Sequence, residues 1–196
     1  MQLGMIGLGR MGANMVRRLM QHGHECVVFD ASADAVKALT DAGATGAASI
    51  DEFIALLRPP RAVWIMLPVP VVEGVVKTVA AHLQAGDTLI DGGNSPFENA
   101  IRRAESLKPA GIHFVDVGTS GGVWGLERGY CLMIGGAREP VQRLEPVFRD
   151  DELLVAGVNT AQAFALKGGR IRRRRLAEVD ALLAAERAEL HDFDTP

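Results

Sequence analysis

The sequence LGMIGLGRMG, residues 3 to 12, joins an apolar run to the start of a helical pattern. Its first four residues predict a strand, and Arg10–Gln21 has the apolar spacing of an amphipathic helix. The junction matches the pattern G-x-G-x-x-G. There the first glycine permits a tight turn, the second lets the backbone approach a phosphate closely, and the third lets the helix pack against the sheet. These glycines are Gly7, Gly9 and Gly12. Because a helix N-terminus offers free N–H groups and the positive end of its dipole, this stretch predicts a dinucleotide-binding turn.

Strand-like and helix-like segments alternate from this turn onward. The predicted strands are Leu3–Ile6, Cys26–Phe29, Ala62–Leu67, Thr88–Ile90, Ile112–Val117 and Cys131–Ile134. The predicted helices are Arg10–Gln21, Ala33–Ala42, Asp51–Leu57, Val71–His82, Phe97–Leu107 and Pro140–Phe148. Several strands are continuous apolar runs, which is typical of strands covered on both faces. The alternation therefore predicts an α/β fold of the Rossmann type, with a doubly wound, mainly parallel sheet. Ser32 is a predicted N-cap, and Ser49 with Glu52 a predicted capping box.

The C-terminal residues differ from this pattern. We expect a dinucleotide-binding domain over residues 1–157 and a short, divergent, helical tail over 158–196. Leu176, Val179, Leu182 and Leu183 form an apolar stripe at helical spacing in the tail. The arginines between positions 170 and 175 are balanced by acidic residues further on, and no aromatic side chains are interleaved with them. We therefore interpret them as a solvated helix face and expect no nucleic-acid partner.

Composition narrows the function further. The chain has 196 residues, 48% of them hydrophobic and 23% charged, and a net charge of −3, which are ordinary values for a soluble globular protein. Cys26 and Cys131 both lie in apolar runs and are predicted to be buried, reduced thiols. No Cys/His spacing suits zinc, and the five histidines are scattered, so no metal site is expected. No signal peptide or membrane-spanning run is visible, and a cytoplasmic protein is expected.

Asp30 ends the second predicted strand, 18 residues beyond Gly12. A carboxylate at this position can accept hydrogen bonds from both ribose hydroxyls of NAD, and it repels the 2′-phosphate of NADP. No arginine follows it, since the next residues are Ala31, Ser32 and Ala33. The sequence thus favours NAD over NADP. The alternative is a glycine turn with an incidental aspartate.

Three further loops follow predicted strands. In an open α/β sheet, ligands lie beyond the carboxyl ends of the strands, so Met66-Leu67-Pro68-Val69-Pro70 is a candidate wall for the cofactor. Its alternative is a stiff turn set by the prolines. The glycine-rich turns at residues 91–95 and 116–126 can hold an anion or a polyhydroxyl ligand. They can equally be ordinary turns.

The blocks GLGRMGANM, LIDGGNS and GTSGGVWGLERGYCLMIGG together resemble the β-hydroxyacid dehydrogenase superfamily, and the third resembles 6-phosphogluconate dehydrogenases. They occur in family order within residues 1–148. The resemblance implies cofactor contacts at Gly7, Leu8, Gly9, Arg10, Met11, Gly12, Asp30, Met66, Leu67, Pro68 and Asn94. It also implies that Asn94 is the one catalytic position present, touching both the substrate and the nicotinamide. Ser120, Gly121 and Gly122 match the turn that binds the substrate carboxylate and hydroxyls.

The activity implied by the resemblance is NAD(P)-dependent oxidative decarboxylation of 6-phosphogluconate to ribulose 5-phosphate. In the family a lysine is the general base on the C3 hydroxyl, and a glutamate helps to protonate the enediol. That reaction is expected to involve a small-molecule substrate only, with no membrane partner, and a homodimer is left open.

The family's K-M-x-H-N-x-x-E-Y pattern, which carries the lysine and the glutamate, does not occur in this sequence. Lys167 lies in AFALKGG, with no His-Asn after it and no glutamate seven residues on. We therefore predict a truncated form that holds the cofactor domain and turns over little or no substrate. The alternatives are a catalytically inactive NAD-binding remnant, and another β-hydroxyacid dehydrogenase or imine reductase. The VWGLERGYC block argues against the last two enzymes.

Overall fold

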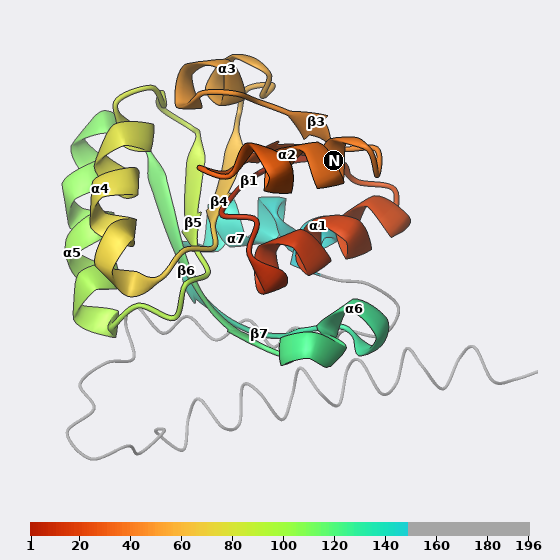
Figure 1. Cartoon of the computed structure of the whole chain (residues 1–196). Coiled ribbons are helices and arrows are strands. Elements are labelled where there is room, and N and C mark those ends of the chain that lie inside the picture. Colours follow the sequence, from red (N-terminus) through yellow and green to blue (C-terminus); the bar gives the residue numbers. More distant parts are fainter. Residues whose placement is uncertain (149–196) are drawn as a thin grey trace, which may run out of the picture.

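The computed structural model describes residues 1–148 of the chain. The expected helical tail over 158–196, its apolar stripe and Lys167 lie outside the described residues. One seven-stranded sheet, with strand order β3-β2-β1-β4-β5-β6-β7, forms the centre of this part of the chain, and helices cover it (Figure 1). The strands are β1 (Gln2–Ile6), β2 (Glu25–Phe29), β3 (Thr45–Gly46), β4 (Ala62–Ile65), β5 (Thr88–Asp91), β6 (His113–Ser120) and β7 (Cys131–Gly136).

The first six strands are parallel. From β1 the chain builds the sheet in one direction through β2 and β3, and it then returns to the other side of β1 to add β4, β5 and β6. This confirms the predicted doubly wound sheet. β7 alone is antiparallel, pairing Ser120 with Cys131 and Val115 with Gly136. Parallel strands need a crossover of a dozen or more residues. The short connection between Ser120 and Cys131 carries only small helical turns, so the chain reverses instead.

The helices are α1 (Arg10–Gln21), α2 (Ala33–Thr40), α3 (Ile50–Ala55), α4 (Val69–Ala80), α5 (Phe97–Leu107), α6 (Gly125–Arg128), α7 (Arg138–Arg143) and α8 (Glu145–Phe148). Two 3₁₀ turns, η1 (Lys108–Ala110) and η2 (Gly122–Trp124), complete the described elements. The sheet has an apolar core on each face. Trp64 of β4 belongs to the core that includes α1, whereas its neighbours Val63 and Ile65 belong to the core under α3, α4 and α5. This alternation along a wholly buried strand explains why its sequence is a continuous apolar run.

Side-chain caps set the starts of α2 and α3. Ser32 accepts a hydrogen bond from the N–H of Ala35 at 3.3 Å, as an N-cap does. At α3 the Glu52 N–H donates to Ser49 Oγ, and Glu52 Oε2 accepts from the Ala48 N–H at 2.7 Å, one residue earlier than in a standard capping box. Both predicted caps are therefore present.

Several bounds differ from the predicted segments, and the short strand β3 was not predicted. The strand predicted over Ala62–Leu67 ends at Ile65. The next helix begins at Val69 rather than Val71 and therefore includes Pro70. Proline fits the first turn of a helix, because the N–H groups there have no partner within the helix. The helix predicted over Pro140–Phe148 is divided into α7 and α8, and Pro146 at the start of α8 has no N–H with which to continue α7.

The prediction for the cysteines is half correct. Cys26 is buried, and its burial raises the pKa of the thiol to about 12. Cys131 is exposed, so the prediction that it is buried is wrong. Along β7 the side chains alternate, with Leu132 and Ile134 buried and Cys131 and Met133 exposed. An apolar run on this strand thus does not mean burial on both faces.

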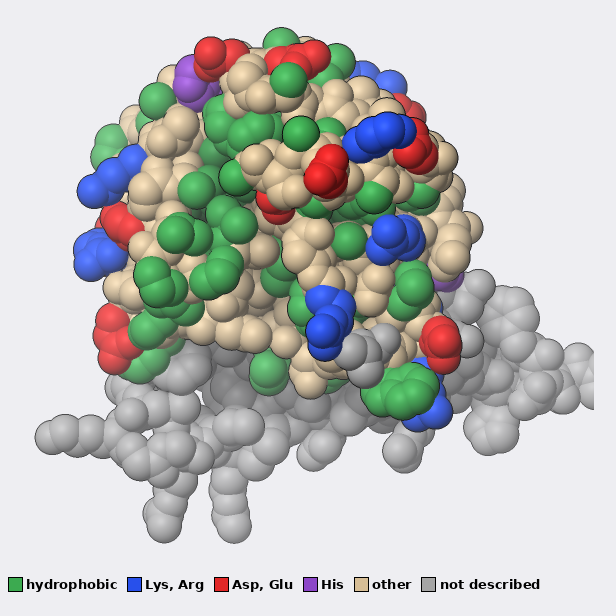
Figure 2. Space-filling model, viewed as in Figure 1, with side chains coloured by type: hydrophobic (Ala, Val, Ile, Leu, Met, Phe, Trp, Pro, Cys, Tyr) green, Lys and Arg blue, Asp and Glu red, His purple; other side chains and the backbone are tan. Residues whose placement is uncertain are grey.

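Exposed apolar side chains gather over the N-terminal halves of α4 and α5, on the left of the molecule in Figure 2. They are Val69, Val71, Phe97 and Ile101. Both helices begin at the edge of the sheet where β4 and β5 end, so this apolar area borders the loops that follow these two strands.

Candidate functional site

The loops that follow β1, β4, β5 and β6 meet at one edge of the sheet, because parallel strands present their carboxyl ends together. The residues selected from the sequence lie on these loops and at the end of β2.

Gly7 and Gly12 shape the first loop. Gly7 has a φ of 96°, which a side chain would strain, and its N–H donates to the Phe29 carbonyl at 3.0 Å. A Cβ atom on Gly12 would overlap the Gly7 carbonyl oxygen. The third glycine of the motif therefore allows α1 to begin directly against the turn, as the sequence pattern predicts.

Gly9 is different, since a Cβ atom placed on it would meet nothing within 4 Å. It is the N-cap of α1, and the first turn of that helix carries no acidic side chain. The space in front of Gly9 is therefore open and faces the positive end of a 12-residue helix. Leu8 is buried and can meet a ligand there only through its backbone, whereas Arg10 is exposed and Met11 half-buried. An absent side chain above a helix N-terminus fits a pyrophosphate group.

Asp30 connects this loop to β2. Its Oδ2 accepts a hydrogen bond from the Leu8 N–H at 2.6 Å, and its Oδ1 accepts from the Ser32 N–H at 2.8 Å. Beside it lies a cavity of about 550 Å³, bounded by α2 and the residues around β3. Lys37 also lines this cavity, and its ammonium is paired with Asp41 at 2.7 Å.

The β4 loop supports the turns on either side of it. A Cβ atom on Gly7 would overlap the Met66 carbonyl oxygen, and one on Gly93 would overlap the Leu67 carbonyl oxygen. The Met66 N–H donates to the Ile6 carbonyl at 2.8 Å, and Pro68 is the N-cap of α4. Met66 and Leu67 therefore lie between the first loop and the β5 loop, so these three loops form one surface.

Asn94 links the β5 loop to the end of β6. Its Oδ1 accepts from the Thr119 N–H at 3.0 Å, and its Nδ2 donates to the Thr119 carbonyl at 3.4 Å. It is the only residue other than glycine with a positive φ (56°) in the described part of the chain, a conformation that asparagine tolerates better than most residues do. The hydroxyl of Thr119 is buried and makes no hydrogen bond within residues 1–148.

Ser120 follows Thr119 and is exposed, at the start of the second glycine-rich turn. Gly121 and Gly122 have φ values of 137° and 51°, so this turn requires residues without a Cβ. The ring of Tyr130 packs beneath the turn, where a Cβ atom on Gly121 would lie 2.9 Å from Cδ1. The selected substrate-side residues are therefore on a shaped turn adjacent to Asn94.

A buried charged network under the β5 loop was missed by the sequence analysis. The side chains of Arg103 and Asp91 are only 3% and 0% exposed, and Arg103 Nη1 lies 2.6 Å from Asp91 Oδ2. Arg103 also contacts Glu73 and Ser95. A helical signal for it existed, because Arg103 shares the inner side of α5 with Ala100 and Leu107.

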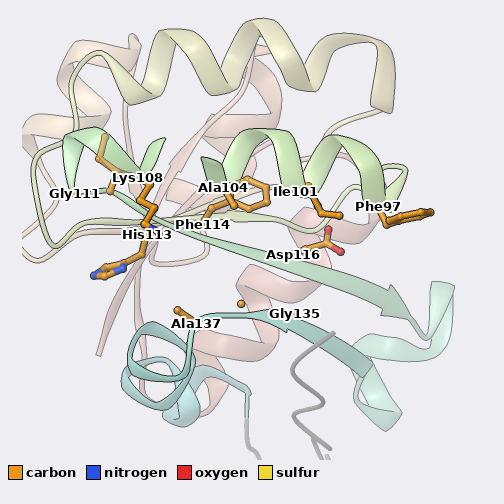
Figure 3. A pocket seen from close by; sticks show the side chains of 13 residues that line it. Phe97, Ile101, Ala104, Lys108, Gly111, His113, Phe114, Asp116, Gly135 and Ala137 are labelled. Atoms are coloured by element: carbon orange, nitrogen blue, oxygen red, sulfur yellow. The ribbon is translucent and has the colours of Figure 1, made fainter. Parts of the chain in front are cut away.

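Asp116 lies beside Asp91 on the neighbouring strand. Burial, and next the negative charge of Asp91, raise the pKa of Asp116 to about 6, although Arg103 opposes the shift. Asp116 lines one end of a groove of about 430 Å³ between α5 and β7, with Phe97 at the same end and Lys108 and His113 at the other (Figure 3).

Within residues 1–148 there is no group of three or more His, Cys, Asp or Glu side chains arranged to hold a metal ion. In the same range, no helix is both long and apolar enough to cross a membrane.

A family model described as the NAD binding domain of 6-phosphogluconate dehydrogenase matches residues 2–151. The chain belongs to this family. The resemblance predicted from the three sequence blocks is thus confirmed, and so are a domain of the NAD(P)-binding class and the relation to oxidoreductases.

Named relatives agree with this family. The chain is 45% identical over 149 residues to the NAD(+)-dependent, decarboxylating 6-phosphogluconate dehydrogenase of Haloferax volcanii, covering 76% of this chain and 49% of that protein. It is 38% identical over 152 residues to the decarboxylating enzyme of Treponema pallidum, covering 74% of this chain and 31% of that protein. The chain therefore spans half or less of the length of these curated relatives.

The solved structure of Mycobacterium tuberculosis 3-hydroxyisobutyrate dehydrogenase is similar, with a TM-score of 0.69 and 26% sequence identity. The match covers 82% of this chain and 55% of that one. This agrees with the predicted relation to the wider β-hydroxyacid dehydrogenases.

Proposed function

We propose that this chain binds NAD across the loop edge of the sheet and is the cofactor domain of a 6-phosphogluconate dehydrogenase. The open space in front of Gly9, at the N-terminus of α1, is the observation that carries the proposal. The pyrophosphate would lie there, held by the backbone N–H groups of the turn from Gly7 to Gly12. Arg10 is exposed beside this space and adds positive charge.

The adenosine half would extend toward Asp30 and the cavity of about 550 Å³ beside it. Each Asp30 oxygen accepts one backbone N–H and keeps a lone pair for a ribose hydroxyl. NAD is favoured over NADP because the carboxylate would repel a 2′-phosphate. Lys37, the one cation among the residues that line this cavity, is already paired with Asp41. The Haloferax volcanii relative is itself described as NAD(+)-dependent.

The nicotinamide half would reach the surface formed by the β4 and β5 loops. Met66, Leu67 and Pro68 would be its wall, and Asn94 would contact both the nicotinamide and the substrate. When bound, NAD supplies the acceptor for a hydride from the substrate. Ser120, Gly121 and Gly122 would bind the carboxylate and hydroxyls of 6-phosphogluconate.

We propose that residues 1–157 form the cofactor domain. The family lysine and glutamate are expected on the K-M-x-H-N-x-x-E-Y pattern, which this sequence does not contain. The second candidate function, NAD binding without turnover, follows from that observation. Both candidates share the same cofactor site.

Calorimetric titration of the full chain with NAD and with NADP tests the proposal. We expect NAD to bind at one site per chain and more tightly than NADP. ADP-ribose should compete with NAD, because it carries the groups expected at Gly9 and Asp30. Absence of binding by all three ligands would contradict the proposal.

A further inference from the structure

Arg103 reaches both ends of the turn that carries Asn94. Its Nη1 lies 2.6 Å from Asp91 Oδ2 and 3.2 Å from Ser95 Oγ. Asp91 ends β5 and Ser95 follows Asn94. One guanidinium nitrogen therefore contacts the residues on both sides of the segment 92–94. The other oxygen of Asp91 accepts the Gly93 N–H at 2.9 Å. Both carboxylate oxygens are therefore used to define the turn.

The other side of the guanidinium is fixed as well. Arg103 Nε donates to Glu73 Oε2 at 3.1 Å, and Arg102 Nη2 donates to the same oxygen at 3.0 Å. Glu73 belongs to α4, so the network joins α4, α5 and the end of β5. Desolvation raises the pKa of the Glu73 carboxyl, but the hydrogen bonds and positive charges of Arg103 and Arg102 together outweigh it, so the pKa is lowered.

Stability alone does not account for a guanidinium at this place. Replacing a buried ion pair by apolar side chains of similar volume is often neutral or stabilising. An apolar residue at position 103, however, cannot hold Asp91 and Ser95 at a fixed separation. Arginine can, because its donors form a rigid fork.

The turn so held presents Asn94 in its left-handed conformation, with its amide paired to Thr119. We propose that Arg103 is a positioning residue, which sets the Asn94 amide for the nicotinamide and substrate side of the site through Asp91 and Ser95. This inference rests on the proposed function, because it takes Asn94 to contact the nicotinamide half of NAD.

Two ligands separate this role from a general effect on folding. ADP-ribose has the pyrophosphate and adenosine groups of NAD but lacks the nicotinamide, so its affinity should not depend on Arg103. The variants are Arg103→Met, Arg103→Lys and the matched control Arg102→Met. Arg102 precedes Arg103 on α5 and shares its Glu73 contact, but its side chain is 62% exposed.

We expect Arg103→Met to weaken NAD binding about tenfold relative to Arg102→Met, which is roughly the contribution of one hydrogen bond. ADP-ribose affinity should be the same in all variants. Arg103→Lys keeps a buried positive charge for Asp91 and should restore part of the loss. If Arg103→Met does not fold, Arg103→Lys is the variant whose affinities for NAD and ADP-ribose are compared. Equal losses for NAD and ADP-ribose, or no loss for either, would overturn the proposal.

A measurement without ligand separates this inference from the proposed function. The side-chain amide signals of Asn94, identified with Asn94→Asp, should shift in the nitrogen–proton spectrum of Arg103→Lys and stay in place in Arg102→Met. If the parent chain binds neither NAD nor ADP-ribose, the proposed function fails and this spectrum still decides the positioning role. Unchanged Asn94 signals in Arg103→Lys would refute that role.

Discussion

The Leu8 N–H donates to Asp30 Oδ2 over 2.6 Å, so the carboxylate at the end of β2 holds the loop that follows β1. Leu8, inside the glycine motif, and Asp30 are 22 residues apart, and the motif and the acidic residue therefore form one unit before any ligand is present. Asp30 is accordingly expected to affect the shape of the loop as well as the choice of cofactor.

Replacement of Asp30 by serine or asparagine should shift cofactor preference toward NADP. The ratio of NADP to NAD affinity should rise about tenfold or more, since a hydrogen bond to a charged group contributes about 1.5–3 kcal/mol. Because both variants also weaken the bond to Leu8, the absolute affinity for NAD should fall. Calorimetry with the two cofactors gives the ratio, and tighter binding of NADP by the parent chain would contradict the assignment.

Substitution of Gly9 by valine should abolish NAD binding and leave the fold intact. A Cβ atom there meets no protein atom within 4 Å, so the side chain would fill only the space expected for the pyrophosphate. Gly74→Val is the matched control, because Gly74 on α4 is equally uncrowded and lies away from the loop. Circular dichroism and calorimetry are the measurements. Unchanged affinity in Gly9→Val, with an unchanged spectrum, would show that the loop is not a phosphate site.

Gly12→Ala, unlike Gly9→Val, should destabilise the protein. Its methyl group would overlap the Gly7 carbonyl oxygen and force α1 away from the turn. Overpacking of this kind costs about 1–3 kcal/mol. Urea denaturation should show the loss, together with weaker NAD binding. A midpoint equal to that of the parent chain would mean that the close contact is not needed.

Asp116→Asn should remove one component of the pH dependence of stability. Burial raises the pKa of Asp116 from 3.8 to about 6 in the folded chain, so the folded state binds more protons between these values. The contribution of Asp116 is fully present below pH 3.8 and is lost as the pH rises through about 6. The parent chain should therefore lose free energy of unfolding relative to Asp116→Asn between pH 4 and pH 7.

Urea denaturation of both proteins at the two pH values tests this, since the other titrating groups are common to both. Asp34→Asn, at an exposed position on α2, is the control for the removal of one surface carboxylate. If the difference in free energy of unfolding between the parent chain and Asp116→Asn is the same at both pH values, the pKa of the Asp116 carboxyl is not raised.

The purified chain should produce little or no NADH from 6-phosphogluconate. General-base catalysis typically raises the reaction rate about 100-fold to 10,000-fold. The family pattern that carries the expected base does not occur in this sequence. The assay includes Lys167→Ala. Turnover at ordinary enzyme rates, about 1–1,000 per second, would refute the prediction. Loss of that turnover in Lys167→Ala would then assign Lys167 as the base.

The fold was predictable where the signals are local. Helical spacing placed α1 and α5 with their observed bounds, and Ser32 and Ser49 marked the starts of α2 and α3, because each signal depends on residues a few positions apart. β3 has only two residues and leaves no periodicity to detect. The reversed direction of β7, and with it the exposure of Cys131, depends on how the turn after Ser120 folds back. No local sequence pattern indicates that direction.

The candidate site was predictable as a set of positions but not as a set of contacts. The motif gives Gly7, Gly9 and Gly12 a role each, and the strand end gives Asp30 one. The pairing of Asn94 with Thr119 joins residues 25 positions apart, so it emerges only when β5 and β6 lie side by side. Arg103 left a readable trace, since a charged residue on the inner side of a helix needs a buried partner.

The chain has two tryptophans, and they differ in their surroundings. Trp64 is completely buried, and its indole lies directly under Gly92 of the turn that leads to Asn94, where a Cβ atom would overlap it. Trp124 is 57% exposed, with the Arg128 guanidinium 5.0 Å from the ring centre. In Trp124→Phe the tryptophan fluorescence would therefore come from Trp64 alone. Because reduced nicotinamide absorbs where tryptophan emits, quenching of that one indole would report, without any added label, how close the nicotinamide ring comes to the β5 loop.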